Sequence, residues 1–415
     1  MSGMKSFLRL FFLLILGQMP AVQALRANGV AGADSLCVSL LTCEPGNAIY
    51  ELYGHTAIRV ENPATGYDWV FNYGVFDFDR PNFIWRFALG QTDYTLGVAP
   101  FDRFAHSYAR DGRSIEAQRL NLTQAEAARL VRALEANASM PGWTYRYNYL
   151  YDNCTTRAVE AIVRCLDGRV EWPAADTTLT FRRIIHQFAD VNAWDRLMQD
   201  LVLGEEVDAP IGIRQQMFSP VYAASFFDGA TIVDASGHRR PLVAERWPVV
   251  QATPLSARPY LIGPAAVFTL LVVLTLGVCI WEIRHRRVCR LYDNTLLFLQ
   301  GLAGCLIAFL FFFSEHPAVG TNWLILLLNP LPLLFLPLKL WRDHKGRRDV
   351  YPMVEGLLVC IFLAGSLVSF QKIPVEMYLV ALILLLRCVN VWFVGRRGAY
   401  CRKLSIKAAD YGRGS

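Results

Sequence analysis

The sequence predicts an exported domain of mixed α and β structure, followed by an all-α bundle of five transmembrane helices. Composition is the first reason: 54% of the 415 residues are hydrophobic and only 18% are charged, which excludes intrinsic disorder and argues against a purely soluble protein. The second reason is an apolar leader of secretory type at the N-terminus. The third is the placement of the long apolar segments, which all lie beyond residue 260.

The N-terminus has the three parts of a secretory signal peptide. Lys5 and Arg9 form a basic start, residues 10–16 form the apolar core, and small residues lead to a cleavage site after Ala24. We therefore expect residues 1–24 to be a signal peptide. An uncleaved anchor is the alternative, and with either one the segment that follows is exported.

Residues 25–258 have the composition of an ordinary globular domain, without an apolar run near the roughly 18 residues that cross a bilayer. Runs rich in β-branched and aromatic residues predict four strands, at 35–41, 55–60, 67–75 and 114–122. The turn-like segment between the second and third strands predicts a hairpin that returns Asn72 and Tyr73 to the side of His55.

Three helical regions are predicted in the same domain. Thr123 and Glu126 fit a capping box ahead of an alanine- and leucine-rich helix that reaches about Ala138. A second helix fits residues 155–166, and residues 178–203 are predicted to be helical in two pieces.

Five apolar segments follow, each long enough to cross about 30 Å of hydrocarbon as a helix. They cover about 261–281, 295–313, 322–340, 352–370 and 376–395. The predicted organisation is therefore a membrane domain over 259–396 and a basic tail over 397–415.

The basic residues predict the orientation of these helices. They gather after the first segment, after the third and in the tail: Arg284, Arg286, Arg287, Arg290; Arg342, Lys345, Arg347, Arg348; Arg396, Arg397, Arg402, Lys403, Lys407 and Arg413. By the positive-inside rule these places are cytoplasmic, which puts the exported domain of this multi-pass membrane protein outside the cytoplasm. These basic residues also account for the pI of 8.8, so the basic charge does not indicate binding to nucleic acid.

Polar residues inside or beside the membrane segments suggest specific roles. Arg387 is costly in the fifth segment, and we expect it either to snorkel or, as we favour, to form a structural ion pair with Glu355. The Asn329-Pro330 pair must distort the third segment. Glu315 and His316 follow the second segment, where they either bind a lipid headgroup or substrate amine or only end the helix.

Cys154 and His55 are the candidates for chemistry. Cys154 stands at the predicted start of a helix, where free N–H groups and the helix dipole stabilise a thiolate and can hold an oxyanion. A nucleophilic cysteine needs a base or an imidazolium partner, which His55 supplies if the fold joins them. Because 99 residues separate them, their spacing in the sequence is only weak evidence for a catalytic pair. The alternative is a buried thiol and an unrelated structural histidine.

The group that orients His55 is Asn72 or Tyr73, since a slip of one residue in the hairpin exchanges them; we favour Asn72. Asn153 either caps the helix, orients Cys154, or does both. Cys37 and Cys43 are about 20 Å apart if the strand between them is extended, which favours two thiols over a disulfide. Metal-binding and nucleotide-binding motifs are missing, so we expect neither metal nor cofactor.

Short runs of sequence in a fixed order resemble the permuted NlpC/P60 branch of papain-like proteins and, more narrowly, the Lnb family of lipoprotein N-acyltransferases. They are Leu41-Thr42-Cys43-Glu44-Pro45-Gly46, Tyr53-Gly54-His55-Thr56-Ala57-Ile58-Arg59, Phe71-Asn72-Tyr73-Gly74, Tyr147-Asn148, Asp152-Asn153-Cys154-Thr155-Thr156, Met217-Phe218-Ser219-Pro220 and Ser314-Glu315-His316-Pro317. The resemblance covers nearly all of the mature chain. It implies an α+β papain-like exported domain joined to a five-helix membrane bundle.

The resemblance also implies an activity. Cys154 would take an acyl chain from a phospholipid as a thioester, with His55 as base and Asn72 and Asn153 in support. The acceptor would be the N-terminal amine of a diacylglyceryl-cysteine lipoprotein. Alternating tyrosines over 145–151 predict one tyrosine-lined face, which either lines a substrate pocket near Cys154 or only packs in the core. We expect Tyr53 and Tyr149 to contact substrate, with Glu315 and His316. The alternatives are a cysteine peptidase or amidase acting on cell-wall peptide, and a membrane-tethered binding module without chemistry.

Overall fold

The computed structural model describes residues 36–46, 51–76, 81–189, 192–253, 260–345, 347 and 351–411, without the side chains of residue 189 and of those after 394. The chain forms two compact units. The first unit contains the chain up to Phe188 and Pro210–Arg258, and the second contains Ala189–Ala209 and the chain from Pro259 onward. The expected signal peptide lies outside the described residues.

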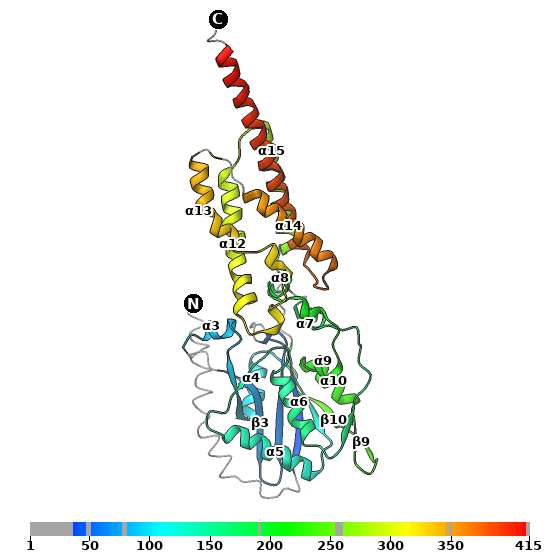
Figure 1. Ribbon diagram of the computed structural model, residues 1–415. Helices are drawn as coiled ribbons and strands as arrows, with labels where there is room; N and C mark the ends of the chain where they lie inside the picture. The colour runs from blue at the N-terminus through cyan, green and yellow to red at the C-terminus, as the bar shows by residue number, and fades with distance from the viewer. Residues whose placement is uncertain are drawn as a thin grey trace. The chain divides into compact units, whose positions relative to one another are not determined.

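An antiparallel sheet of seven strands lies at the centre of the first unit (Figure 1). In the order β10-β5-β1-β2-β3-β4-β6, its strands are Val243–Val250, Ile115–Leu120, Cys37–Cys43, His55–Asn62, Tyr67–Val75, Asp93–Pro100 and Tyr145–Arg146. A smaller sheet contains β7 (Arg169–Glu171), β8 (Thr231–Val233) and β9 (Arg239–Pro241).

Helices lie between the strands in sequence. They are α3 (Phe83–Ala88), α4 (Phe101–Arg110), α5 (Gln124–Ser139), α6 (Cys154–Arg164), α7 (Phe181–Ala189), α9 (Ile213–Gln216) and α10 (Pro220–Gly229). Of these, α4, α5, α6 and α10 pack on the sheet. The predicted class of mixed α and β structure is confirmed. The capping box of Thr123 and Glu126 starts α5, as predicted.

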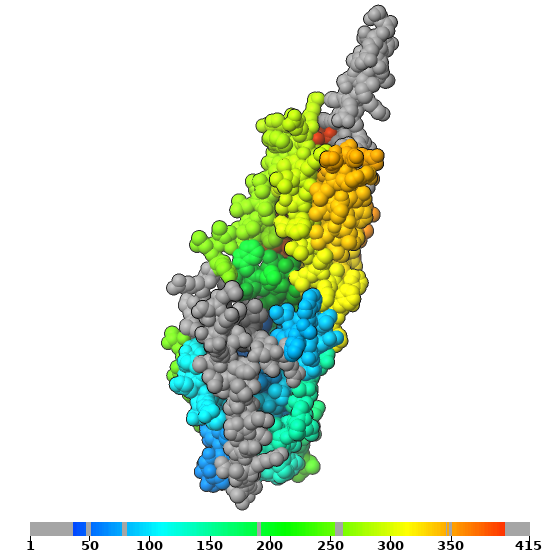
Figure 2. All heavy atoms as spheres, turned by 90° about the vertical axis from the view of Figure 1, so that its left-hand side faces the viewer, coloured from blue at the N-terminus to red at the C-terminus, as the bar shows by residue number. Residues whose placement is uncertain are grey.

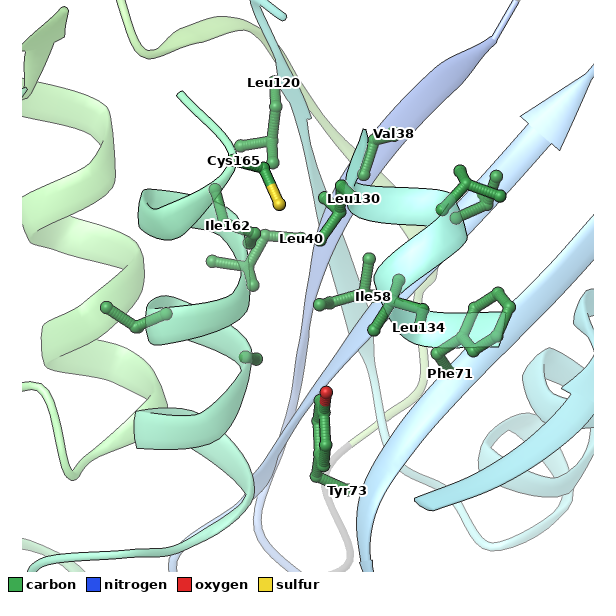
Figure 3. Close-up of a cluster of buried hydrophobic side chains, with 14 of the residues drawn as sticks. Val38, Leu40, Ile58, Phe71, Tyr73, Leu120, Leu130, Leu134, Ile162 and Cys165 are labelled. Atoms are coloured by element: carbon green, nitrogen blue, oxygen red, sulfur yellow. The ribbon is translucent and has the colours of Figure 1, made fainter. Parts of the chain in front are cut away.

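Alternation along the strands divides the apolar residues between the two faces of the sheet. In β2, Ile58 and Val60 join the core under α5 and α6, whereas Ala57 joins a second cluster with Phe104 of α4. Figure 3 shows the first core, in which strand residues meet residues of α5 and α6: Val38, Leu40, Ile58, Phe71, Leu130, Leu134 and Ile162. This core holds α6 against β2 and thereby fixes where Cys154 lies.

The second unit contains five helical segments long and apolar enough to cross a membrane, within the residues that the structure describes. They are Pro264–His285, Arg290–Phe313, Trp323–His344, Tyr351–Val368 and Val375–Val394. These correspond to α11, α12, the pair η5 (Trp323–Leu326) and α13 (Leu331–His344), α14, and the first part of α15 (Val375–Tyr411). The predicted all-α membrane domain is confirmed in number and order, and the third segment breaks at Asn329-Pro330, as predicted.

Arg387 forms buried ion pairs, but the predicted partner is wrong. Its guanidinium donates to Glu282 of α11 at 2.9 Å and to Asp293 of α12 at 2.7 Å. Glu355 is instead bound by Tyr351 at 2.7 Å and Gln300 at 2.5 Å. The two acidic groups from different helices compensate the buried guanidinium, which explains why this residue is tolerated there.

Residues 189–209 dock on the membrane helices of the second unit, although they stand between two parts of the first unit in sequence. The segment contains α8 (Ala193–Val202) and η3 (Glu205–Asp208), and Leu197 lies in the same core as residues of α12, α14 and α15. The Glu205 carboxylate accepts from Phe370 N–H at 2.9 Å and from Trp323 Nε1 at 3.1 Å. We call residues 189–209 the docking segment.

Candidate active site

His55 and Cys154 meet where a strand and a helix begin. His55 is the first residue of β2, Cys154 is the first residue of α6, and each of the two side chains shifts the pKa of the other. Beside them, the hydroxyls of Thr56 and Thr155 lie 3.0 Å apart in the interior. The starts of β2 and α6 are therefore joined at two successive positions.

Asn72 binds the other side of the His55 ring. It lies on β3, and its carboxamide oxygen faces His55 Nε2 within hydrogen-bonding distance. Because this oxygen only accepts, Nε2 carries the hydrogen and Nδ1 is left for the thiol of Cys154. Tyr73 points into the core instead (Figure 3), where its hydroxyl accepts from Asn137 at 3.3 Å.

The surroundings of the pair favour its charged form. Burial alone would raise the pKa of the Cys154 thiol, but His55, the Thr56 N–H and the Thr155 hydroxyl lower this pKa to about 7. Burial would lower the pKa of His55, but Cys154 and Asn72 raise it. A thiolate beside an imidazolium is therefore accessible near neutral pH.

Asn153 is the N-cap of α6. Its side-chain oxygen accepts from the N–H groups of Thr155 and Thr156, both at 2.9 Å. Its side-chain nitrogen donates to the carbonyls of Tyr149 and Phe218 at 2.8 and 2.9 Å. Asn153 thus holds the start of the helix in place and contacts the Met217–Pro220 motif, without a contact to His55 among those the structure describes.

The other two buried cysteines of the first unit lack this activation. Cys43 pairs with His55 across the β1–β2 register, but burial raises the pKa of its thiol to about 12. Cys165 ends α6, and burial also raises its pKa. Cys37 and Cys43 stand at opposite ends of β1. Only Cys154 combines a helix start with an imidazole partner in the described part of this unit.

Two glycines make room for this geometry. At Gly54 (φ +76°) a Cβ would lie 2.5 Å from the Cys43 carbonyl oxygen, so a side chain would displace the strand start that carries His55. At Gly74 (φ +90°) a Cβ would lie 3.4 Å from Cys154 Cβ and 3.6 Å from the Tyr147 ring. The absence of a side chain at Gly74 keeps open a space beside the sulfur-bearing carbon.

The tyrosines near Cys154 do not form the single extended face that their alternation suggests. β6 ends at Arg146, and Asn148 then closes a turn by accepting from the N–H groups of Leu150 and Tyr151 at 3.0 and 3.1 Å. Tyr151 is consequently exposed, whereas Tyr145 is buried beside the open space at Gly74.

The predicted substrate-binding residues lie in both units. The ring centroids of Tyr53 and Tyr149 lie 4.9 Å apart, and Tyr53 immediately precedes the Gly54-His55 pair. Glu315 and His316 belong to the second unit, in the turn between α12 and η4 (Pro317–Val319). The roles of all four in binding substrate stay predictions.

The arrangement brings together a thiol with a lowered pKa, an imidazole and a carboxamide, which are the kinds of group that a cysteine nucleophile requires. The sequence patterns did not single out Thr56, Thr155 or Gly74, which complete this geometry. Their positions next to His55, Cys154 and Tyr73 within the quoted motifs are the signal that could have identified them.

Comparisons with known families match both parts of the chain. The model of the Lnb N-terminal periplasmic domain matches residues 27–187, and the model of the Lnb transmembrane domain matches residues 256–397. No curated protein and no solved structure gives a match. The chain carries both domains in order, with a periplasmic N-terminal domain and a multi-pass membrane domain. It therefore belongs to the Lnb family, whose domains indicate a membrane-bound enzyme of the acyltransferase kind.

Proposed function

We propose that the protein is a cysteine-dependent lipoprotein N-acyltransferase. The donor is a membrane phospholipid, and the acceptor is the α-amine of a diacylglyceryl-modified N-terminal cysteine on a lipoprotein. The observation that carries the proposal is the Asn72–His55 hydrogen bond beside Cys154, whose pKa His55 lowers, at the start of α6 within a domain of the Lnb type.

The first half-reaction transfers the acyl group to sulfur. The Cys154 thiolate attacks the ester carbonyl carbon of the phospholipid, forming a C–S bond. The C–O bond then breaks, and the lysophospholipid alkoxide leaves with the proton of the His55 imidazolium. A thioester on Cys154 and a neutral imidazole remain.

The second half-reaction transfers the acyl group to nitrogen. The neutral α-amine of the acceptor attacks the thioester carbon, the C–S bond breaks, and His55 takes the amine proton. Because α-amines titrate near 8, a useful fraction is neutral without special tuning. An environment poor in water favours the amine over hydrolysis of the thioester.

Two donors are proposed for the oxyanion that forms in each half-reaction. Asn153 engages the N–H groups of Thr155 and Thr156, so the Cys154 N–H is the first-turn amide left for the oxyanion. The Tyr145 hydroxyl is buried without a hydrogen-bond partner among the described residues. It lies 3.9 Å from where a Cβ on Gly74 would stand, in the same space that Cys154 borders. Such donors stabilise an oxyanion strongly because they are fixed in advance.

The remaining expectations on organisation belong to this proposal. Residues 25–258 are the periplasmic catalytic domain after removal of 1–24, 259–396 span the inner membrane, and the basic residues 397–415 are cytoplasmic. We also propose that Tyr53, Tyr149, Glu315 and His316 contact the donor or acceptor. The membrane domain keeps the protein in the bilayer that holds both lipid-anchored substrates.

The test is mass spectrometry of lipoprotein N-termini from a knockout strain complemented with the wild type, Cys154→Ala or Cys43→Ala. We expect N-acylated termini with the wild type and with Cys43→Ala, and only free amines with Cys154→Ala. N-acylation that persists with Cys154→Ala would refute the proposal. Cleavage of muropeptides by the purified wild type, without lipoprotein acylation, would establish a peptidase or amidase instead.

A further inference from the structure

Helix α3 places a group of large apolar side chains on the surface of the first unit. The exposed fractions are 81% for Ile84, 62% for Trp85 and 52% for Phe87. Figure 2 shows this light-blue segment at the surface. Among the described residues of the first unit, the other large apolar side chains with this exposure, such as Met140, stand singly on other elements. A contiguous exposed apolar group on a soluble domain indicates a binding surface.

Basic side chains border this apolar group. Arg86 of α3 donates to Asp93 at 2.8 Å, and Arg146 donates to the same carboxylate at 3.1 Å. Exposed Trp, Ile and Phe beside arginine is the composition of a segment that lies in the interface of a membrane.

A row of aromatic rings leads inward from α3. Ring centroids of Phe87 and Phe83 lie 6.2 Å apart, and those of Phe83 and Phe76 lie 5.5 Å apart, both pairs stacked. Phe76 lies 4.9 Å from Tyr94, which stacks on Tyr147 at 4.2 Å. The rings thus form a continuous apolar series, from a helix with exposed hydrophobic residues to the interior.

The inner end of this row lies at the nucleophile. The Tyr147 ring and Cys154 Cβ border the same space at Gly74, with 3.6 and 3.4 Å to the position of a Cβ there. A chain that follows the rings from α3 would therefore reach the side of Cys154. The apolar faces of these rings suit a hydrocarbon chain better than a peptide, which needs hydrogen-bond partners along its length.

We propose that α3 inserts into the lipid surface and that the row Phe87–Phe83–Phe76–Tyr94–Tyr147 accommodates the acyl chain of the donor on its way to Cys154. A lipid surface is the occupant that fits, because the same chain has five segments able to span a membrane and because basic residues border the apolar group. The role of the row rests on the proposed function, whereas the contact of α3 with lipid does not.

The contact with lipid is tested without activity. An environment-sensitive fluorescent amino acid is placed at position 84 or, as control, at position 140 of the full chain in phosphatidylethanolamine–phosphatidylglycerol vesicles. We expect a blue-shifted emission at 84 that brominated lipids quench, and emission typical of water at 140. Emission typical of water at both positions would overturn the proposed insertion.

The path of the acyl chain is tested with two donors. Formation of the thioester on Cys154 is followed by mass spectrometry with vesicle phospholipid and with a short-chain phospholipid that is monomeric in water. We expect Ile84→Glu to slow acylation from vesicles by about tenfold, because it removes the burial of one large apolar side chain, and to leave the soluble donor unaffected. Met140→Glu should change neither rate.

The other outcomes separate the competing roles of α3. If Ile84→Glu slows thioester formation equally with both donors, α3 covers the site. If it slows only the transfer from the thioester to the lipoprotein, α3 is the docking surface of the acceptor. Either result contradicts the proposal that the donor enters at α3. If the wild type forms no thioester with either donor, the proposed function and the acyl path fail, while the fluorescence result still decides whether α3 binds lipid.

Discussion

The hydroxyls of Thr56 and Thr155 lie 3.0 Å apart in the interior of the first unit, although 99 residues separate them in sequence. His55 and Cys154 have the same separation and precede these two residues. The hydrogen bond therefore sets the start of β2 against the start of α6 at the position where imidazole and thiol meet. Thr155 also contacts the sulfur directly, with its hydroxyl 3.8 Å from Cys154 Sγ.

Alkylation of Cys154 should show the lowered pKa of its thiol. The rate with iodoacetamide should rise with pH through a midpoint at about 7, since the thiolate is the reactive form. Thr155→Val should move the midpoint upward because a group that lowers this pKa is lost, whereas Thr155→Ser keeps the hydroxyl and should resemble the wild type. Mass spectrometry of the labelled peptides at each pH gives the alkylation rate of the wild type and of both variants. An unchanged midpoint in Thr155→Val would show that the hydroxyl does not stabilise the thiolate.

Asn72→Ala should slow thioester formation by roughly 10- to 100-fold, because the His55 ring loses the contact that orients it. Tyr73→Phe is the matched control: its hydroxyl contacts Asn137 in the core and should be dispensable for rate. Single-turnover acylation gives both values. A larger loss in Tyr73→Phe than in Asn72→Ala would transfer the orienting role to the tyrosine.

Tyr145→Phe should lower the acylation rate by about 100- to 1,000-fold, the usual effect of losing one oxyanion donor. The alkylation rate of Cys154 should stay close to that of the wild type, since iodoacetamide forms no oxyanion. Tyr147→Phe retains the ring and should retain most activity. Parallel losses of acylation and alkylation in Tyr145→Phe would indicate a structural role instead.

Gly74→Ala should reduce acylation far more than Gly66→Ala does. Both glycines have positive φ, at +90° and +70°, so each alanine costs about 1–2 kcal/mol of backbone strain. Only the Cβ at position 74 approaches Cys154, at 3.4 Å, while nothing lies within 4 Å of the one at position 66. Comparable melting temperatures with unequal activities would support the space at Gly74 as part of the site; equal activities would argue against it.

Much of the fold could be predicted because hydropathy and alternation are local signals. The strands over 55–60 and 67–75 and the capped helix at Thr123 follow from patterns within a few residues, and all three occur. Helix α3 and strand β4 were not predicted. In α3 exposed apolar residues replace the usual amphipathic pattern, and β4 carries a glycine and ends in proline, which weakens the signal of a strand.

Contacts between distant segments could not be predicted to the same extent. The cost of a charge in the membrane predicts that Arg387 has a partner, but Glu282, Asp293 and Glu355 all lie on apolar helices, and only packing selects among them. His55 and Cys154 could be nominated by chemistry, while their contact depends on the pairing of β1, β2 and β3 under α6.

The docking segment is another such case. Helical periodicity predicts α8, yet periodicity does not say which core a helix joins. Leu197 packs among membrane helices, and the polar groups of Asn322 and Gln371 bind the carbonyls of Leu201 and Leu203. A hydrogen bond from a side chain to the backbone carbonyl of a distant loop cannot be predicted from the local sequence pattern.

Gly204→Ala should weaken this docking and lower the melting temperature of the purified protein. The new Cβ would lie 2.8 Å from the carbonyl carbon of Thr321 and 3.0 Å from the nitrogen of Asn322, and backbone atoms cannot move aside cheaply. Overpacking of this kind costs about 1–3 kcal/mol. Gly212→Ala is the control, since its nearest neighbour is 3.9 Å away and both glycines have φ near −80°. If the two variants have the same melting temperature, the contact between the docking segment and the Thr321 turn contributes little to stability, and the segment is held by its other contacts.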